Sequence, residues 1–462
     1  KGDVPRSFDL MSRAGIKWLR DEISWGACER EKGKIVIPEW ADRYMRAAVE
    51  HGVTPLIIFD YGNALYDEGN APTSPEAQEA FGRYCYALVD HFKDICKHWE
   101  VYNEPNIGFW RPKPDPEAYA RLMRVAYAAA KSADPSCTVV GVCTAGTDLG
   151  FIESVLKSGG MQAMDALSIH PYRYPGSPEG TGFVAEVTRA HELMERFGGK
   201  EKKLWLTEIG WPTQDDARGV SEQTSGNYLV RMCVLARTVP FIERIFWYDF
   251  QDDGLDRTCN EHNFGLIRWE SFSPKAGYVA CKVLADHLGG GQFSRKLHPT
   301  GEEDTRHCYE FEAADGPVLV AWSAEGSGTL ALALEAEEVS LTWADAHREV
   351  QRPVDGRLTL ALTDMPVFIR GWSGEARIAE ACMSVAASPQ PVGPGERFAV
   401  KVTAPSGSRV RLSYDPAAPI KAREPEKGEV SENTFHFTVS RQAAAQAVPF
   451  VATAVDGEGK LL

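Results

Sequence analysis

Two glutamates stand where short apolar runs give way to turn residues. One is Glu104, in the run Trp-Glu-Val-Tyr-Asn-Glu-Pro-Asn at residues 99 to 106, and the other is Glu208, in Leu-Trp-Leu-Thr-Glu-Ile-Gly-Trp-Pro-Thr at residues 204 to 213. An apolar run of this kind is typical of a strand that delivers a side chain to one edge of a sheet. Hydrolysis of a glycosidic bond needs two carboxylates that face one carbon atom, and the pair indicates this chemistry.

Either glutamate alone could instead cap a helix or join a surface ion pair. The flanking residues favour a site. Glu104 lies between Asn103 and Pro105, and Glu208 is followed closely by Gly210, so each carboxylate belongs to a turn with a constrained backbone. A barrel of parallel strands brings such turns together at one mouth.

Between residues 7 and 288, amphipathic helical stretches alternate with short apolar runs, which indicates repeated βα units. The predicted strands are 16–20, 54–59, 99–103, 138–143, 165–170, 203–207 and 244–247. A closed barrel of this type needs eight strands, and residues 7–14 already have the pattern of the helix that precedes the second strand. The sequence therefore predicts a (β/α)8 TIM barrel whose first strand is missing from the chain start. A strand upstream of Lys1, or a substitute strand, is expected to fill the gap.

Beyond residue 289 the pattern changes to period-two alternation, as in Val318-Leu-Val-Ala-Trp-Ser, and helical signals nearly vanish. A second change of composition follows Trp372. These changes predict C-terminal β-sandwich domains after the barrel. The predicted domains are a catalytic barrel at 1–290, a small β-domain at 291–375 and an immunoglobulin-like β-sandwich at 376–462.

At several motifs the chain resembles the clan A glycoside hydrolases, and most of all family 39. The resemblance covers residues 7–370 and is carried by Asn103-Glu104-Pro105, Thr207-Glu208, Trp247, Ser168-Ile-His-Pro-Tyr and Asn263-Phe-Gly-Leu. In this clan the acid/base follows the fourth strand and the nucleophile ends the seventh. With the missing strand counted as the first, Glu104 and Glu208 take these two places.

The resemblance implies a retaining mechanism in which Glu104 is the general acid/base and Glu208 is the nucleophile. It implies that Asn103 hydrogen-bonds the 2-hydroxyl of the sugar, and that His170 and Tyr172 orient Glu208. It implies neither a cofactor nor a metal ion.

Other candidates have a structural alternative. Arg20, at the end of the second strand, could keep Glu208 ionised or form an ion pair inside the barrel. Trp247 could stack on a sugar ring or pack in the core. Weaker candidates, equally compatible with subsites and with packing, are Trp25, Tyr61, Trp110, Trp211 and Glu261. Further possible polar contacts are Asp60, Asp249, Asp252 and Asp253, although residues 249–256 lack calcium-loop spacing and are predicted to be a solvated loop.

Composition limits the classes of function. The formal net charge of -15 provides no basic footprint for nucleic acid and favours a neutral oligosaccharide or polysaccharide as partner. No apolar run approaches the roughly 20 residues of a membrane span. The chain start lacks the apolar segment of a signal peptide, so we expect a secreted or cell-surface protein with its leader removed, or a cytoplasmic one. The ten cysteines show no zinc-site spacing and are predicted to be mostly buried thiols.

The sequence leaves open the sugar, the linkage, exo or endo action and the oligomeric state. Family 39 relatives include exo-acting xylosidases, uronidases and endo-acting polysaccharide hydrolases. A uronic acid substrate is the least favoured, because the predicted mouth loops carry no cationic cluster. A second class is a carbohydrate-binding or scaffold protein that has the same fold without turnover, and the presence of both glutamates argues against it.

Overall fold

The computed structural model describes residues 3–297 and 305–379 and, beyond them, six strands between residues 384 and 455. By their contacts the residues form two compact units. The first contains the chain up to Gly326 with the segments Val339–Val350 and Thr363–Gly371. The second contains Ser327–Glu338, Gln351–Leu362 and the chain from Trp372 onward. The domain boundaries expected from the sequence stay predictions.

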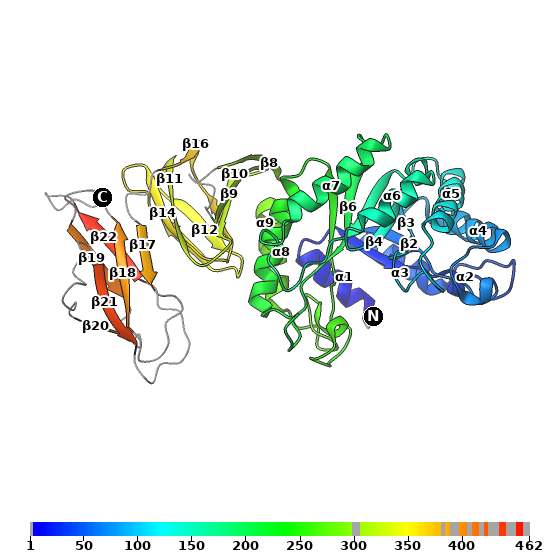
Figure 1. Ribbon diagram of the computed structural model, residues 1–462, viewed down its shortest axis with the longest axis horizontal. Coiled ribbons are helices and arrows are strands. Elements are labelled where there is room, and N and C mark those ends of the chain that lie inside the picture. The colour runs from blue at the N-terminus through cyan, green and yellow to red at the C-terminus, as the bar shows by residue number, and fades with distance from the viewer. Residues whose placement is uncertain are drawn as a thin grey trace. The chain divides into compact units, whose positions relative to one another are not determined.

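Seven parallel strands form the centre of the first unit, and helices lie on their outside (Figure 1). They pair in sequence order: β1 (Trp18–Glu22), β2 (Thr54–Phe59), β3 (His98–Val101), β4 (Thr138–Ala145), β5 (Ala166–His170), β6 (Lys203–Ile209) and β7 (Ile242–Trp247). The predicted TIM-type barrel without its first strand is therefore confirmed. Each strand lies within a few residues of its predicted position.

The helices follow the strands as the βα pattern requires. They are α1 (Val4–Arg13), α2 (Trp25–Cys28), α3 (Glu39–Glu50), α4 (Pro75–Phe92), α5 (Pro116–Ala133), α6 (Leu149–Lys157), α7 (Phe183–Arg196), α8 (Glu222–Arg237) and α9 (Ala276–Leu288), with short 3-10 turns η1 (Asp67–Gly69), η2 (Gly160–Ala163) and η3 (Asn260–Asn263). Several begin at a capping side chain. Asp115 accepts from the Ala118 N–H at 2.9 Å, and Pro116 occupies the first helical turn of α5.

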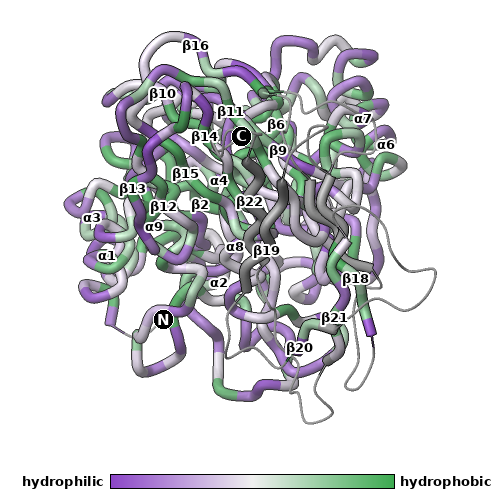
Figure 2. Tube along the Cα trace, turned by 90° about the vertical axis from the view of Figure 1, so that its left-hand side faces the viewer, coloured by the Kyte–Doolittle hydropathy of each residue, from purple (hydrophilic) through white to green (hydrophobic). Residues whose placement is uncertain are grey.

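The barrel has an apolar base. Leu56, Val140, Ala166 and Trp205, each in the first half of its strand, form a buried cluster with Phe246 of β7. Figure 2 shows hydrophobic segments along strands such as β2 and β15, whereas many loops are hydrophilic. The cluster fills one end of the barrel, so polar chemistry is confined to the opposite end, where the strands terminate.

The sheet is open between its first and last strands. β1 pairs only with β2 and β7 only with β6 among the described residues. Side chains span this gap, because the Arg244 guanidinium lies 4.6 Å from the Trp18 ring centre and Phe246 meets the same ring edge-on. On the outside the helical layer closes, where Tyr278 of α9 donates to the Leu10 carbonyl oxygen of α1 at 2.8 Å. The expected additional strand stays a prediction.

The remaining strands form β-sheets in both units. In the first unit a six-stranded sheet has the order β13 (Arg348–Gln351), β12 (Val339–Trp343), β15 (Val367–Arg370), β10 (Gly316–Ser323), β9 (Arg306–Ala313) and β8 (Gln292–Lys296). The second unit has one sheet of β14 (Arg357–Leu362), β11 (Gly328–Glu335) and β16 (Ser373–Ile378), one of β17 (Ser384–Ser388), β18 (Arg397–Thr403), β21 (Thr434–Val439) and β20 (Ile420–Arg423), and one of β19 (Arg409–Tyr414) and β22 (Phe450–Val455).

These sheets confirm the predicted β-sandwich region, while the immunoglobulin-like assignment stays a prediction. The nine described cysteines are free and most are buried, as predicted, and Cys382 lies outside the described residues. Within the described ranges, no helix has the length and apolar character that crossing a bilayer requires.

A buried ion pair fixes α8 against the six-stranded sheet. Arg231 of α8 is fully buried and its Nε donates to Glu179 Oε1 at 3.0 Å. The same carboxylate accepts from Trp322 Nε1 of β10 at 2.8 Å. Because two elements share this carboxylate, its removal would leave an uncompensated cation inside the protein.

We therefore expect Glu179→Ala to lower the free energy of unfolding by about 3 to 5 kcal/mol. Urea unfolding followed by tryptophan fluorescence measures this change. The control is Glu39→Ala, which removes the partner of exposed Arg43 and should cost less than about 1 kcal/mol. Equal losses of unfolding free energy in the two variants would contradict the assignment of Glu179 and Arg231 as a buried ion pair.

Candidate active site

The two glutamates meet at the carboxyl ends of β3 and β6. A carboxylate oxygen of Glu104, a carboxylate oxygen of Glu208 and a ring nitrogen of His170 all lie within 4.8 Å of one another. Carboxyl groups of retaining glycosidases are about 5 to 5.5 Å apart, whereas those of inverting enzymes are roughly 6.5 to 9.5 Å apart. The short separation matches the first group.

The backbone after β3 turns Glu104 towards this point. Tyr102 and Glu104 have φ values of 66° and 47°, in the left-handed region that side-chain-bearing residues rarely occupy. The turn is held because the Glu104 N–H donates to the Cys143 carbonyl oxygen at 3.0 Å. Backbone strain of this kind persists only where surrounding contacts enforce it, and it is common at functional sites.

Arg20 connects the strand ends. Its Nη1 donates to Glu208 Oε1 at 2.6 Å, its Nε to Glu100 Oε2 at 2.5 Å and its Nη2 to Asn103 Oδ1 at 2.7 Å. Burial by itself would lower the pKa of Arg20, but the negative charge of Glu100, and then that of Glu208, raises the pKa well above its ordinary value. The guanidinium is therefore a permanent cation among three side chains of the site.

Glu100 was given no role by the sequence analysis. It is fully buried within β3, and besides Arg20 it accepts a hydrogen bond from Ser168 Oγ at 2.6 Å. The available signal was a carboxylate inside an otherwise apolar strand, because such a group is rarely buried without a partner. The negative charge of Glu100 thus offsets the positive charge of Arg20.

Glu208 is held as a carboxylate. Tyr172 Oη donates to its Oε2 at 2.8 Å. Burial would raise the pKa of Glu208, but the charges of His170 and Arg20, with hydrogen bonds from Tyr172 and Arg20, lower it below the ordinary value. At neutral pH the group is thus ionised and able to act as a nucleophile.

His170 lies between the two carboxylates, nearer to Glu104. Its Nδ1 is 2.8 Å from Glu104 Oε1 and 3.5 Å from Glu208 Oε2, while its Nε2 is 3.1 Å from Thr207 Oγ1 and 3.4 Å from Cys143 Sγ. Burial would lower the pKa of His170, but the charge of Glu208 and the contacts with Cys143 and Glu104 raise it well above 6.5. The sequence analysis expected His170 to orient Glu208, and it gave no role to Thr207 or Cys143.

Among the aromatic candidates, Trp247 is partly exposed, whereas Trp211 and Trp25 are buried. Trp247 is half-buried, stacks on Trp211 at 5.8 Å, and its indole N–H has no hydrogen-bond partner within the described ranges. Trp211 is fully buried and donates to the Gly176 carbonyl oxygen at 2.8 Å. Trp25 is also fully buried and donates to Glu29 Oε2 at 2.7 Å. The expected substrate contacts of Trp25 and Trp211 are therefore corrected to packing, because both rings are enclosed by other side chains and carbonyl groups.

The remaining candidates differ in exposure. Trp110 is buried, whereas Glu261 is exposed and accepts from Tyr248 Oη at 3.1 Å. Tyr61 is half-buried and stacks on exposed Phe109 at 5.6 Å.

The acidic loop after β7 is not uniformly solvated. Asp252 is buried and its Oδ1 accepts from Lys275 Nζ at 2.9 Å and from the Gly265 N–H at 2.8 Å. The prediction of a solvated loop is therefore wrong at Asp252, because an ion pair and a backbone donor satisfy the buried carboxylate.

Two groups of ligand-type atoms lie close together in the described chain. One is Glu100, Cys143 and His170, and the other is Glu104, His170 and Glu208. In the first, Glu100 already accepts from Arg20 and Ser168, and the Arg20 guanidinium lies 3.4 Å from Cys143 Sγ. A divalent cation there would meet a fixed positive charge, so these contacts fit a hydrogen-bonded network better than a metal centre.

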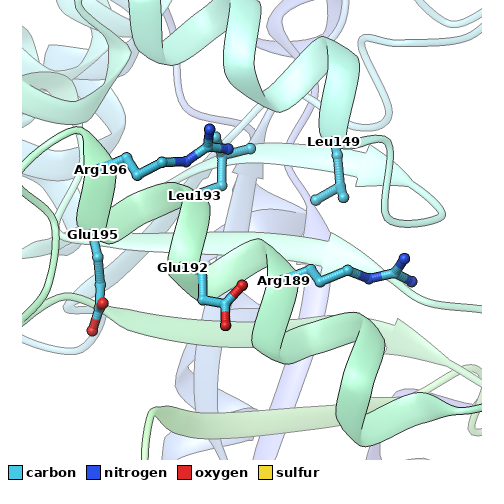
Figure 3. A pocket seen from close by; sticks show the side chains of 6 residues that line it. All are labelled: Leu149, Arg189, Glu192, Leu193, Glu195 and Arg196. Carbon is cyan, nitrogen blue, oxygen red and sulfur yellow. The ribbon is translucent and has the colours of Figure 1, made fainter.

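A hollow between α6 and α7 is separate from this site (Figure 3). It is lined by Leu149 at the start of α6 and by Arg189, Glu192, Leu193, Glu195 and Arg196 of α7. Its residues belong to the helical layer, whereas the paired glutamates lie at the strand ends. The hollow therefore has no part in the chemistry described here.

Several solved structures have a fold similar to that of this chain. The chain is similar to a family 39 glycoside hydrolase from Bacteroides cellulosilyticus WH2, with 27% identity, a TM-score of 0.70 and coverage of 80% of this chain and 78% of that one. It also shares its fold with a β-xylosidase from Caulobacter crescentus, at 19% identity and a TM-score of 0.56, over 80% of this chain and 92% of that one.

Among curated proteins, the coniferin β-glucosidase of Pinus contorta is 29% identical over 106 residues, which are 22% of this chain and 21% of that protein. The matching segment thus spans about a fifth of this relative. No family model matches the chain.

The chain is therefore similar to the glycosidases of clan A, and the solved structures that it resembles include members of family 39.

The contacts of Tyr172 lead to a prediction about ionisation. Tyr172→Phe removes a donor that stabilises the carboxylate of Glu208, so the pKa of Glu208 should rise. A lowered carboxyl pKa stabilises the folded state above the pKa of the unfolded chain, and this contribution is lost on acidification. The variant should therefore be less stable than the wild type at pH 7, and the difference should shrink as the pH falls.

Carbon-13 NMR of the carboxyl groups, with Glu208→Gln to assign the signal, measures this pKa. Urea unfolding across pH measures the stability. Tyr174→Phe is the matched control, because the Tyr174 hydroxyl contacts Asn260 rather than Glu208. An unchanged or lower Glu208 pKa in Tyr172→Phe would show that the hydroxyl does not stabilise the carboxylate.

Proposed function

We propose that the protein is a retaining glycosidase that cleaves β-glycosidic bonds in a neutral oligosaccharide or polysaccharide. The observation that carries this proposal is the short separation of Glu104 and Glu208, whose carboxylate oxygens lie within 4.8 Å of each other. Similarity to a family 39 glycoside hydrolase over most of the chain supports the same reaction class.

In the first step Glu208 attacks the anomeric carbon. The bond from that carbon to the leaving oxygen breaks, and Glu104 transfers its proton to this oxygen. The sugar is then held as an ester of Glu208. Arg20 and Tyr172 favour this step because they keep Glu208 ionised before the attack.

In the second step water attacks the same carbon from the side that the leaving group has vacated. Glu104, now a carboxylate, takes a proton from this water, and Glu208 leaves as a carboxylate. Two inversions give net retention of configuration. His170 is within hydrogen-bond distance of Glu104 in the structure and can hold its carboxylate in place between the two steps.

Substrate contacts follow from the groups around the pair. Asn103 is fixed by Arg20 next to Glu104, where it can bond the 2-hydroxyl of the sugar. Trp247 is half-buried and can offer its ring to the apolar face of the sugar. The named relatives include a β-xylosidase and a β-glucosidase, so aryl β-xylosides and β-glucosides are the first substrates to test.

The two glutamates should respond differently to removal. Glu104→Ala should still be glycosylated by substrates with good leaving groups, and azide should rescue turnover to a product of retained β-configuration. Glu208→Ala should be nearly inactive, and azide should enter from the vacated side to give the α-product. Kinetics with an aryl glycoside, together with proton NMR of the products, measures both.

An inverted product from the wild type, or exchanged azide products, would refute the assignment. Absence of turnover of every aryl glycoside, with binding of the sugar retained, would instead indicate the carbohydrate-binding alternative.

The sheets beyond the barrel lead to a further expectation. Every residue placed in the site belongs to the first unit, and β17 to β22 belong to the second. A chain that ends after residue 379 should therefore keep kcat/KM for small aryl glycosides within about twofold of the full-length value. The reason is that none of the residues placed in the site is removed. A folded truncated protein that has lost most of its activity would contradict this expectation.

A further inference from the structure

β1 presents two charged side chains to the interior of the barrel. Side chains alternate along a strand, so Arg20 and Glu22 share one face and Asp21 takes the other. Asp21 is held outside, where its Oδ2 accepts from Tyr44 Oη of α3 at 2.5 Å. Glu22 is therefore two residues further along the strand than Arg20, at the mouth, and it is exposed.

Asp60 joins Glu22 from the neighbouring strand. Glu22 is opposite Ile58 in the β1–β2 register, and Asp60 follows Ile58 by two residues, so its side chain leaves the chain on the same face. Asp60 is fully buried, and neither of its carboxylate oxygens has a partner at ordinary hydrogen-bond geometry within the described ranges. Its backbone oxygen is fixed by the Trp25 N–H at 2.6 Å.

A buried carboxyl without a cationic partner is costly as an anion. Burial is the largest cause that raises the pKa of Asp60 well above its ordinary value, and the charge of Glu22 adds to it, while Arg20 acts in the opposite sense. The pKa of Glu22 is raised as well, first by the partial burial of its carboxyl. The pKa of the fully buried Asp60 is raised further, so Asp60 is the member of the pair that favours its proton.

Glu22 and Asp60 are connected to Glu208 through Arg20. Directly below Glu22 on the same face, Arg20 contacts Glu208 at 2.6 Å and Asn103 at 2.7 Å. A sugar whose anomeric carbon lies over Glu208, and whose 2-hydroxyl meets Asn103, extends its remaining hydroxyls over the surrounding strand ends. The end of β1 is one of these.

We propose that Glu22, supported from below by the carboxylic acid of Asp60, accepts hydrogen bonds from a ring hydroxyl of the sugar bound over Glu208. This inference rests on the proposed function and refines its substrate class. A carboxylate acceptor at this place selects neutral sugars that carry a hydroxyl there. It rejects uronic acids whose carboxylate would face Glu22 without a cation between them.

The test combines enzyme variants with altered substrates. Glu22→Gln is compared with the wild type on an aryl β-glycoside and on its analogues that lack the 3- or 4-hydroxyl. For the parent substrate kcat/KM should fall about 10- to 100-fold, mostly through KM, as expected for loss of a hydrogen bond to a charged group. For the analogue that lacks the contacted hydroxyl the fall should be within about twofold, because that contact is already absent.

Asp60 provides a second arm. Asp60→Asn keeps a donor towards Glu22 and should change KM little, whereas Asp60→Ala should raise it. Glu22→Gln should also raise kcat/KM for an aryl glucuronide relative to the neutral parent. Asp21→Asn, on the outer face of the same strand, is the matched control and should leave KM unchanged. Circular dichroism and the urea midpoint establish that each variant is folded.

Three results would overturn the inference. They are an equal loss for Glu22→Gln on the parent and on every deoxy analogue, no loss on any substrate, or unaltered discrimination against the glucuronide. Azide rescue of Glu104→Ala on the same substrate separates this inference from the proposed function. If azide rescues Glu104→Ala and Glu22→Gln leaves kcat/KM unchanged on every substrate, the role of Glu22 is refuted and the proposed function stands.

If no glycoside is hydrolysed, the proposed function fails. Calorimetric binding of the parent and deoxy glycosides to wild type and Glu22→Gln then decides the inference, by the same comparison.

Discussion

The arrangement of the site depends on the buried guanidinium of Arg20. Removing a cation from water costs several kcal/mol unless charges and hydrogen bonds replace its hydration. Glu100, Glu208 and Asn103 supply them from β3, β6 and the turn after β3. Arg20 and His170 are positive, and Glu100 and Glu208 are negative, so these four charges balance. Glu104 joins this set through His170, whose Nδ1 lies 2.8 Å from Glu104 Oε1.

The parts of the fold visible in sequence were those set by local pattern. The strands are apolar runs that end at turn residues. The paired glutamates were visible for the same reason. Glu100 and Cys143 were not, because each lies inside an apolar run and acquires meaning only from neighbours on other strands. For Trp25 and Trp211 the sequence could not choose between a subsite and packing, because burial of a loop aromatic is decided by tertiary packing.

The open side of the barrel places unusual demands on β1. This strand carries Arg20 and Glu22, yet in the described chain it has a hydrogen-bonded neighbour on one edge only. Side chains supply the remaining constraints. Trp18 is held at the base by Arg244 and Phe246, and Asp21 is held outside by Tyr44. The position of the strand is thus fixed at its base and on its outer face, as well as through Arg20 inside.

Under the proposed function, this arrangement couples support of Glu208 to recognition of the sugar. Alternation along one short strand sets Arg20 beneath Glu208 and Glu22 at the mouth, so a shift of β1 moves both together. Such a shift would lengthen the 2.6 Å contact between Arg20 and Glu208 and allow the pKa of Glu208 to rise. It would also separate Glu22 from Asp60. Under the proposed function, ionisation of Glu208 and binding of the sugar ring therefore depend on the same structural element.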